Sequence, residues 1–172
     1  MPKRPRAPCA PRRTKALVAD APLARLTRIR VRYADTDRMG IAYHANYLVW
    51  FEVGRTEWLR ESGWTYREME AGGVSLPVIE AHCEYRLPAR YDDEIEISTA
   101  ATVLSQVRIR FDYEARLTGS SALAATGHTV HASLGVDGRP RRLPARVLEL
   151  LPRGPRHSRE RGAVAGFGDG AR

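Results

Sequence analysis

The sequence lacks the features that mark secreted, metal-binding and membrane-spanning proteins. Its two cysteines, Cys9 and Cys83, provide neither a disulfide framework nor the ligand spacing of a metal site. No apolar run approaches the roughly 20 residues of a membrane span, and the basic start lacks the apolar stretch of a secretory signal. There is also no glycine-rich phosphate loop and no Gly-x-Ser-x-Gly elbow. We therefore expect a cytoplasmic protein with no membrane span and no bound metal.

Positive charge is concentrated at the two ends of the chain. Although the net charge is +8, residues 1–25 hold seven basic residues against one acid, and residues 152–172 hold five against two. The intervening residues 26–151 are nearly neutral, whereas a nucleic-acid-binding domain carries its positive charge on the folded part. We expect no specific nucleic-acid partner. The ends contain few large apolar residues, so we predict two basic disordered tails around one domain at 26–151.

The spacing of apolar residues predicts one strand, one long helix and then a run of strands. Residues 26–34 alternate basic and apolar side chains, as in a half-buried strand. From about residue 45 to 61 apolar residues recur at intervals of three and four, and Gly63 is suited to end this helix. The other predicted elements are a short helix at 65–70, strands at 74–87, 93–104, 106–117 and 122–136, and a last short helix at 143–151.

This order of elements indicates an α+β fold, in which an antiparallel sheet of about five strands wraps around a long central helix. We expect the helix to be largely enclosed, because its apolar residues cover more than one face. These residues are Trp50, Phe51, Val53 and Trp58. The exposed side and edge of such a sheet favour self-association, so we also expect a homodimer or homotetramer.

Residues 35–47, DTDRMGIAYHANY, run directly into the long helix. Free N–H groups at a helix start carry partial positive charge and can stabilise an oxyanion, and an acid shortly before them can activate or supply a nucleophile. Alone, the pattern leaves a structural alternative open, because Asp before a helix is often a cap or turn residue. Tyr43 and Asn46 either line a pocket or cap the helix. No further carboxylate or His lies at a metal-ligand spacing.

Three segments of the domain carry a family resemblance. They are residues 32–59, which contain the motif and the first part of the helix, residues 88–93, PARYDD, and residues 137–144, DGRPRRLP. In order and spacing they resemble the 4-hydroxybenzoyl-CoA thioesterase family, and in particular its bacterial branch associated with the Tol-Pal system. The resemblance implies a hotdog fold and hydrolysis of acyl-CoA, or of an acyl-carrier-protein thioester, without a cofactor, in a cleft between two subunits.

The resemblance also implies roles for individual residues. Asp37, the second acid of the Asp-Thr-Asp element, takes the catalytic position, either as nucleophile or as general base. The backbone amide at about His44 is expected to polarise the thioester carbonyl, and the His44 side chain is implicated as well. Tyr43 and Asn46 are candidates for substrate binding, and Arg108 is a candidate for contact with a CoA phosphate. The alternative function is a non-catalytic hotdog module that binds acyl-CoA as a sensor or scaffold.

Overall fold

The computed structural model describes residues 18, 21 and 23–154 of the 172-residue chain. Most of the two predicted tails therefore lies outside the described residues. Described residues just outside 26–151 pack against the domain. Val18 is buried, and the Leu23 carbonyl accepts a hydrogen bond from the Trp58 indole. At the other end, Arg153 pairs with Val103. The packed region thus extends a few residues beyond 26–151 at both ends.

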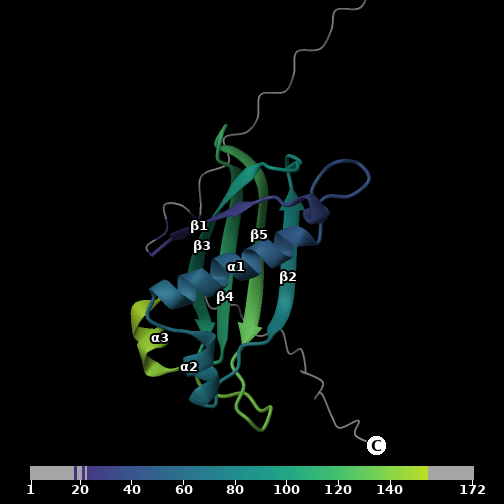
Figure 1. The fold of residues 1–172 in the computed structure, drawn as a ribbon. Helices are drawn as coiled ribbons and strands as arrows, with labels where there is room; N and C mark the ends of the chain where they lie inside the picture. The colour runs from purple at the N-terminus through teal and green to yellow at the C-terminus, as the bar shows by residue number, and fades with distance from the viewer. Residues whose placement is uncertain (1–17, 19–20, 22, 155–172) are drawn as a thin grey trace, which may run out of the picture.

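Five strands form a single antiparallel sheet with the order β1-β3-β4-β5-β2 (Figure 1). The first two strands of the chain lie at the two edges of the sheet. The last three form its centre and are connected to one another by short turns. Their bounds are β1 Arg25–Arg30, β2 Val78–Tyr85, β3 Glu94–Ser105, β4 Arg108–Leu117 and β5 Ala122–Ala132. The predicted sheet of about five antiparallel strands is confirmed.

Helix α1, Asn46–Glu61, crosses one face of this sheet, with its N-terminal end towards the end of β2 (Figure 1). Gly63 follows the helix with a φ of +75°, in the left-handed region that the sequence prediction assigned to it. The shorter helices are α2, Tyr66–Ala71, and α3, Ala145–Leu150, and one 3-10 turn, η1, spans Tyr33–Asp35. No helix in the described part of the chain is long and apolar enough to cross a bilayer.

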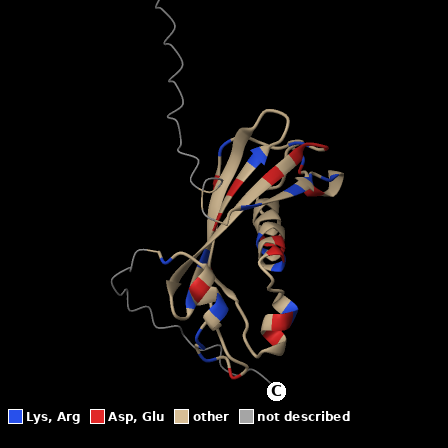
Figure 2. Cartoon of the chain, turned by 90° about the vertical axis from the view of Figure 1, so that its left-hand side faces the viewer, with Lys and Arg blue, Asp and Glu red and all other residues tan. Residues whose placement is uncertain are grey.

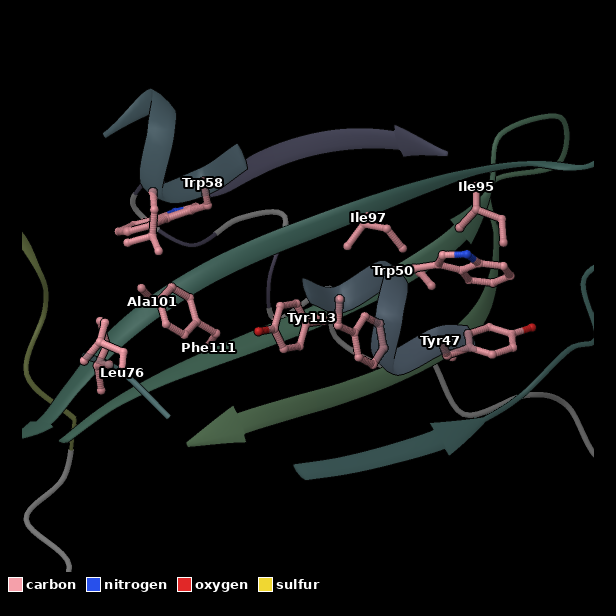
Figure 3. Close-up of a cluster of buried hydrophobic side chains, with 14 of the residues drawn as sticks. Tyr47, Trp50, Trp58, Leu76, Ile95, Ile97, Ala101, Phe111 and Tyr113 are labelled. Carbon is pink, nitrogen blue, oxygen red and sulfur yellow. The ribbon is translucent and has the colours of Figure 1, made fainter. Parts of the chain in front are cut away.

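The core lies between α1 and the inward face of the sheet (Figure 3). Alternation along the strands directs every second side chain towards the helix, so Phe51 stacks on Tyr113 at a centroid distance of 4.5 Å. Trp58 meets Phe111 edge-on at 5.7 Å. These aromatic residues fill the core, which fixes the position of α1 and therefore of its N-terminus.

Helix α1 is enclosed in part. Trp50, Phe51 and Trp58 are buried as expected, whereas Val53, which was also expected to be enclosed, is 39% exposed. Its neighbours Leu48 and Val49 are 38% and 55% exposed. The edge strand β2 is also uncovered, since all of its residues except Cys83 are exposed. The sequence shows that these helix residues are apolar, but it does not show which of them face the sheet and which face outward.

Charged residues are spread over the strands, the helices and the loops. Basic and acidic segments are interleaved along the strands and helices rather than separated by sign (Figure 2). Cross-strand and same-strand pairs account for much of this pattern, as in Arg28 with Glu96 at 3.4 Å and Arg116 with Glu114 at 3.0 Å. The folded part therefore presents mixed charge, in agreement with its near-neutral composition.

Candidate active site

The loop that leads into α1 is built around Asp35, which is 4% exposed. Its carboxylate accepts hydrogen bonds from the backbone N–H of Arg32 at 2.9 Å and from the Arg32 guanidinium at 2.8 Å. Its backbone carbonyl accepts the N–H of Tyr43 and the side-chain amide of Asn46, both at 2.8 Å. The hydrogen bond from Arg32 lowers the pKa of Asp35. Asp35 thus uses both its carboxylate and its backbone carbonyl in hydrogen bonds, and it holds the loop against the helix start.

Asp37 lies half-buried further along the same loop. Its Oδ1 accepts the N–H of Met39 at 2.8 Å, which forms an Asx turn, and Thr36 pairs with Ala42 across the loop. Gly40 closes the turn with a φ of +70°. Within residues 23–154 no hydrogen bond is made to Asp37 Oδ2. One carboxylate oxygen therefore holds the turn, while the other is available for chemistry.

The two residues just before α1, His44 and Ala45, present two free backbone amides. The carbonyls of Tyr43 and His44 point into the first helical turn, where they accept the N–H groups of Asn46 at 2.9 Å and of Tyr47 at 3.4 Å. The N–H groups of His44 and Ala45 donate to no group in the described part of the chain. Unpartnered N–H groups at a helix start attract negative charge. This end of α1 can therefore hold an oxyanion.

The side chains of the helix start lie at the surface. His44 is exposed, and its ring lies 4.4 Å from that of Tyr43, which is 47% exposed. Asn46 donates its side-chain amide to the carbonyl of Asp35, which ties the helix start to the loop. This contact is not a helix cap, because the N-cap is Ala45 and α1 has no side-chain cap hydrogen bond among the described residues. Asp37, Tyr43, His44 and Asn46 all belong to this one closed loop and helix start.

Arg108 does not join these residues within one chain. It begins β4 on the sheet face that points away from α1, and it pairs with Ala132. Tyr85, which contacts the helix start, pairs with Ala125 on the same neighbouring strand. Seven residues along a strand span about 23 Å at the usual rise per residue. Arg108 is therefore near the opposite end of the sheet from His44.

Sequence reasoning missed two residues that support the helix start. The hydroxyl of Tyr85, at the end of β2, donates a hydrogen bond to the carbonyl of His44 at 3.0 Å. The hydroxyl of Tyr47 accepts the N–H of Ala89 at 3.3 Å, and the carbonyl of Ala89 accepts the N–H of Ala42 at 2.8 Å. Alternation places Tyr85 on the helix side of β2, but no sequence signal says that it reaches His44.

No group of three or more His, Cys, Asp or Glu side chains that could hold a metal ion occurs among the described residues. His128 and His131, three positions apart, point to opposite faces of β5. His128 pairs with Glu80 on the outer face at 2.8 Å, whereas His131 is fully buried under α1. The loop itself offers a free carboxylate oxygen on Asp37 and, where it enters α1, two free backbone N–H donors.

Most of the described chain is similar in sequence to known proteins. A family profile described as the Thioesterase-like superfamily matches residues 31–151. The 1,4-dihydroxy-2-naphthoyl-CoA hydrolase of Synechococcus elongatus is 32% identical over 124 residues, which cover 70% of this chain and 90% of that protein. YneP of Bacillus subtilis is 49% identical over 71 residues, so the match spans 41% of this chain and about half, 51%, of that relative.

Solved structures agree with the fold. The crystal structure of the DHNA-CoA thioesterase from Staphylococcus aureus matches with a TM-score of 0.66 and 34% sequence identity. The match covers 70% of this chain and 80% of the other. The sheet and the helix across it are therefore the hotdog arrangement that the sequence resemblance implied.

Proposed function

The chain belongs to the Thioesterase-like superfamily, and from this premise we propose that it hydrolyses an acyl-CoA thioester to a free acid and CoA. The observation that carries the proposal is the pair of free amides of His44 and Ala45 in the same loop as the free carboxylate oxygen of Asp37. The name of the Synechococcus relative, a CoA-thioester hydrolase, agrees with it. The narrower placement in the 4-hydroxybenzoyl-CoA thioesterase family and its Tol-Pal-associated branch is part of the same proposal.

The reaction needs a nucleophile and a place for the charge that forms on the thioester oxygen. Asp37 Oδ2 either attacks the carbonyl carbon, which releases CoA thiolate and leaves a mixed anhydride for water to cleave, or takes a proton from a water that attacks the same carbon. In the second route the tetrahedral intermediate expels CoA thiolate, which takes up the proton from Asp37. In both routes the carbonyl oxygen gains negative charge, and the N–H groups at the start of α1 hold it. The reaction uses water as its only second substrate and calls for no cofactor.

We further propose that the working unit is a homodimer or homotetramer. The exposed apolar residues Val49 and Val53 on α1 and the uncovered edge of β2 give a second copy both an apolar face and free strand hydrogen-bonding groups. In such an assembly the loop at Asp37 would face a neighbouring subunit, which would supply the walls of the acyl site. A phosphate contact by Arg108 requires a second subunit, because one chain holds it far from His44.

The test is a thiol-release assay on purified protein with butyryl-, hexanoyl-, benzoyl- and succinyl-CoA. Asp37→Asn keeps an oxygen for the turn at Met39 but removes the charge, so kcat should fall at least about a hundredfold while the fold is retained. Asp137 is a matched control, because it forms the same Asx turn with the N–H of Arg139, at 3.1 Å, in an exposed loop. Asp137→Asn should leave kcat unchanged.

Two outcomes would reject the proposal. Binding of acyl-CoA by the wild type without any hydrolysis would favour the non-catalytic binding module, and equal losses for Asp37→Asn and Asp137→Asn would remove Asp37 from the chemistry. A single turnover in 18O-labelled water tests the anhydride route. Label in the Asp37 carboxylate supports the anhydride, because only water that attacks the Asp37 carboxyl carbon places it there. Label in the product acid alone is expected from the general base and also from an anhydride cleaved at the acyl carbon.

A further inference from the structure

Tyr85 lies at the point where the edge strand β2 meets the start of α1. Its hydroxyl donates a hydrogen bond to the backbone carbonyl of His44 at 3.0 Å. Its ring packs edge-on against Tyr47 with a centroid distance of 5.2 Å, and it lies at 90° to the His44 ring at 6.4 Å. Tyr85 therefore joins a strand to the residue next to the free amides.

The carbonyl that Tyr85 binds shares a peptide group with one of those amides. Because a trans peptide is planar, the C=O of His44 and the N–H of Ala45 point in opposite directions and turn together. The intrahelical bond to the His44 carbonyl, from the N–H of Tyr47, is long at 3.4 Å. The bond from Tyr85 is the shorter of the two and comes from outside the helix, so it restrains the rotation of this peptide group.

We propose that Tyr85 is a positioning residue, whose hydroxyl fixes the His44–Ala45 peptide so that the Ala45 N–H points at the oxyanion of the reaction. This inference rests on the proposed function, since it assigns a task within that reaction. Catalytic N–H donors act through a fixed direction towards the developing charge. Desolvation raises the pKa of Tyr85 to about 12, so the phenol keeps its proton and remains a donor throughout the pH range of an assay.

The test is Tyr85→Phe, which keeps the ring against Tyr47 and removes only the hydroxyl. Loss of a whole oxyanion donor costs about a hundred- to a thousandfold in kcat, so a donor that is present but misdirected should cost about tenfold. We expect kcat to fall about tenfold, while KM and the melting temperature stay near the wild-type values. In a 15N-labelled sample without substrate, the amide resonance of Ala45 should shift and exchange faster with solvent.

Tyr66→Phe is the matched control. It removes a phenol hydroxyl that accepts a hydrogen bond from Arg55 Nε at 2.6 Å, towards the other end of α1. We expect this variant to lower the melting temperature and to leave kcat and the Ala45 resonance unchanged. A fall in kcat for both variants in proportion to their loss of stability would reduce Tyr85 to an ordinary packing residue and overturn the inference.

The failures of the two proposals are distinguishable. A wild-type protein that hydrolyses no acyl-CoA refutes the proposed function, and the Ala45 resonance then still reports whether Tyr85 sets the peptide. An active wild type with unchanged kcat in Tyr85→Phe refutes the positioning role alone. An unchanged Ala45 resonance in Tyr85→Phe refutes it independently of activity.

Discussion

Replacing Gly54 with alanine adds one methyl group where helix α1 lies against β3. A Cβ at this position would lie 2.7 Å from Thr99 Oγ1 and 2.9 Å from Ile97 Cγ2, whereas ordinary contact begins at 3.4 Å. Both neighbours belong to a buried central strand, so neither can move into solvent. The helix or the strand must therefore shift by about 0.5 to 0.7 Å to admit the methyl group.

Two opposing effects decide the sign of this substitution. Alanine is better than glycine in a helix interior by about 1 kcal/mol. Overpacking a tight core costs about 1–3 kcal/mol, and contacts this short at two rigid neighbours place Gly54→Ala in the upper part of that range. We expect a net loss of about 1–2 kcal/mol in unfolding free energy, which lowers the melting temperature by about 4–8 °C for a domain of this size. Because α1 carries the free amides, kcat should fall as well.

Thermal and urea unfolding, together with the thiol-release assay, measure both effects. Gly119→Ala in the turn between β4 and β5 is the control, since a Cβ there meets no atom within 4 Å, and it should be neutral. Thr99→Ala removes the atom nearest to the new methyl group. The double variant Gly54→Ala/Thr99→Ala should therefore lose less unfolding free energy than the sum of the losses in the two single variants. A Gly54→Ala variant as stable as the wild type would show that α1 is not seated this closely on β3.

One titration and two further substitutions test individual contacts of the fold, near the site and away from it. Burial lowers the pKa of His131 to about 4. As the pH falls below about 6.5, the His131 side chain binds a proton in the unfolded chain before it does so in the folded one. The free energy of unfolding should therefore drop by up to about 3 kcal/mol between pH 6.5 and 4. Urea unfolding across this range should show a flatter profile for His131→Asn. Asp35→Asn loses the charged pair with Arg32 and should cost about 1–2 kcal/mol of stability, with a far smaller effect on kcat than Asp37→Asn. Thr65→Ala, which breaks the capping box with Glu68, should cost about 1 kcal/mol and leave kcat unchanged.

The sequence was most informative where local spacing alone decides the structure. The predicted helix at 45–61 agrees with α1 at Asn46–Glu61, because its end depends on a glycine that the chain itself provides. The strands predicted at 74–87 and 122–136 were too long, since regular pairing between β2 and β5 ends at a register shift near Val78. Beyond it, Ser75 and Leu134 form only an isolated bridge. Apolar alternation continues through these residues although the ladder does not.

The two acids of the Asp-Thr-Asp element show a different limit. Residue types alone gave Asp35 and Asp37 the same structural alternative, and only the resemblance separated them. The structure separates them by hydrogen bonding: Asp35 is buried and uses both carboxylate oxygens on Arg32, whereas Asp37 uses one oxygen for its turn. Arg32 precedes Asp35 by only three residues, so their contact is local in the sequence. It forms because the 3-10 turn η1 brings the two side chains together, and the residue types alone do not predict that turn.

The proposed orientation of the Ala45 amide depends on a contact that no local sequence pattern predicts. Tyr85 and His44 are 41 residues apart and meet because β2 takes the edge position next to β5, which brings its end to the start of α1. A one-residue slip of β2 against β5 would turn Tyr85 to the outer face and Glu84 inward, since successive side chains alternate. On the proposed role of Tyr85, the register of the exposed edge strand β2 governs the direction of the Ala45 N–H at the start of α1. A substitution that loosens this edge should then lower kcat by releasing the contact of Tyr85 with the His44 carbonyl.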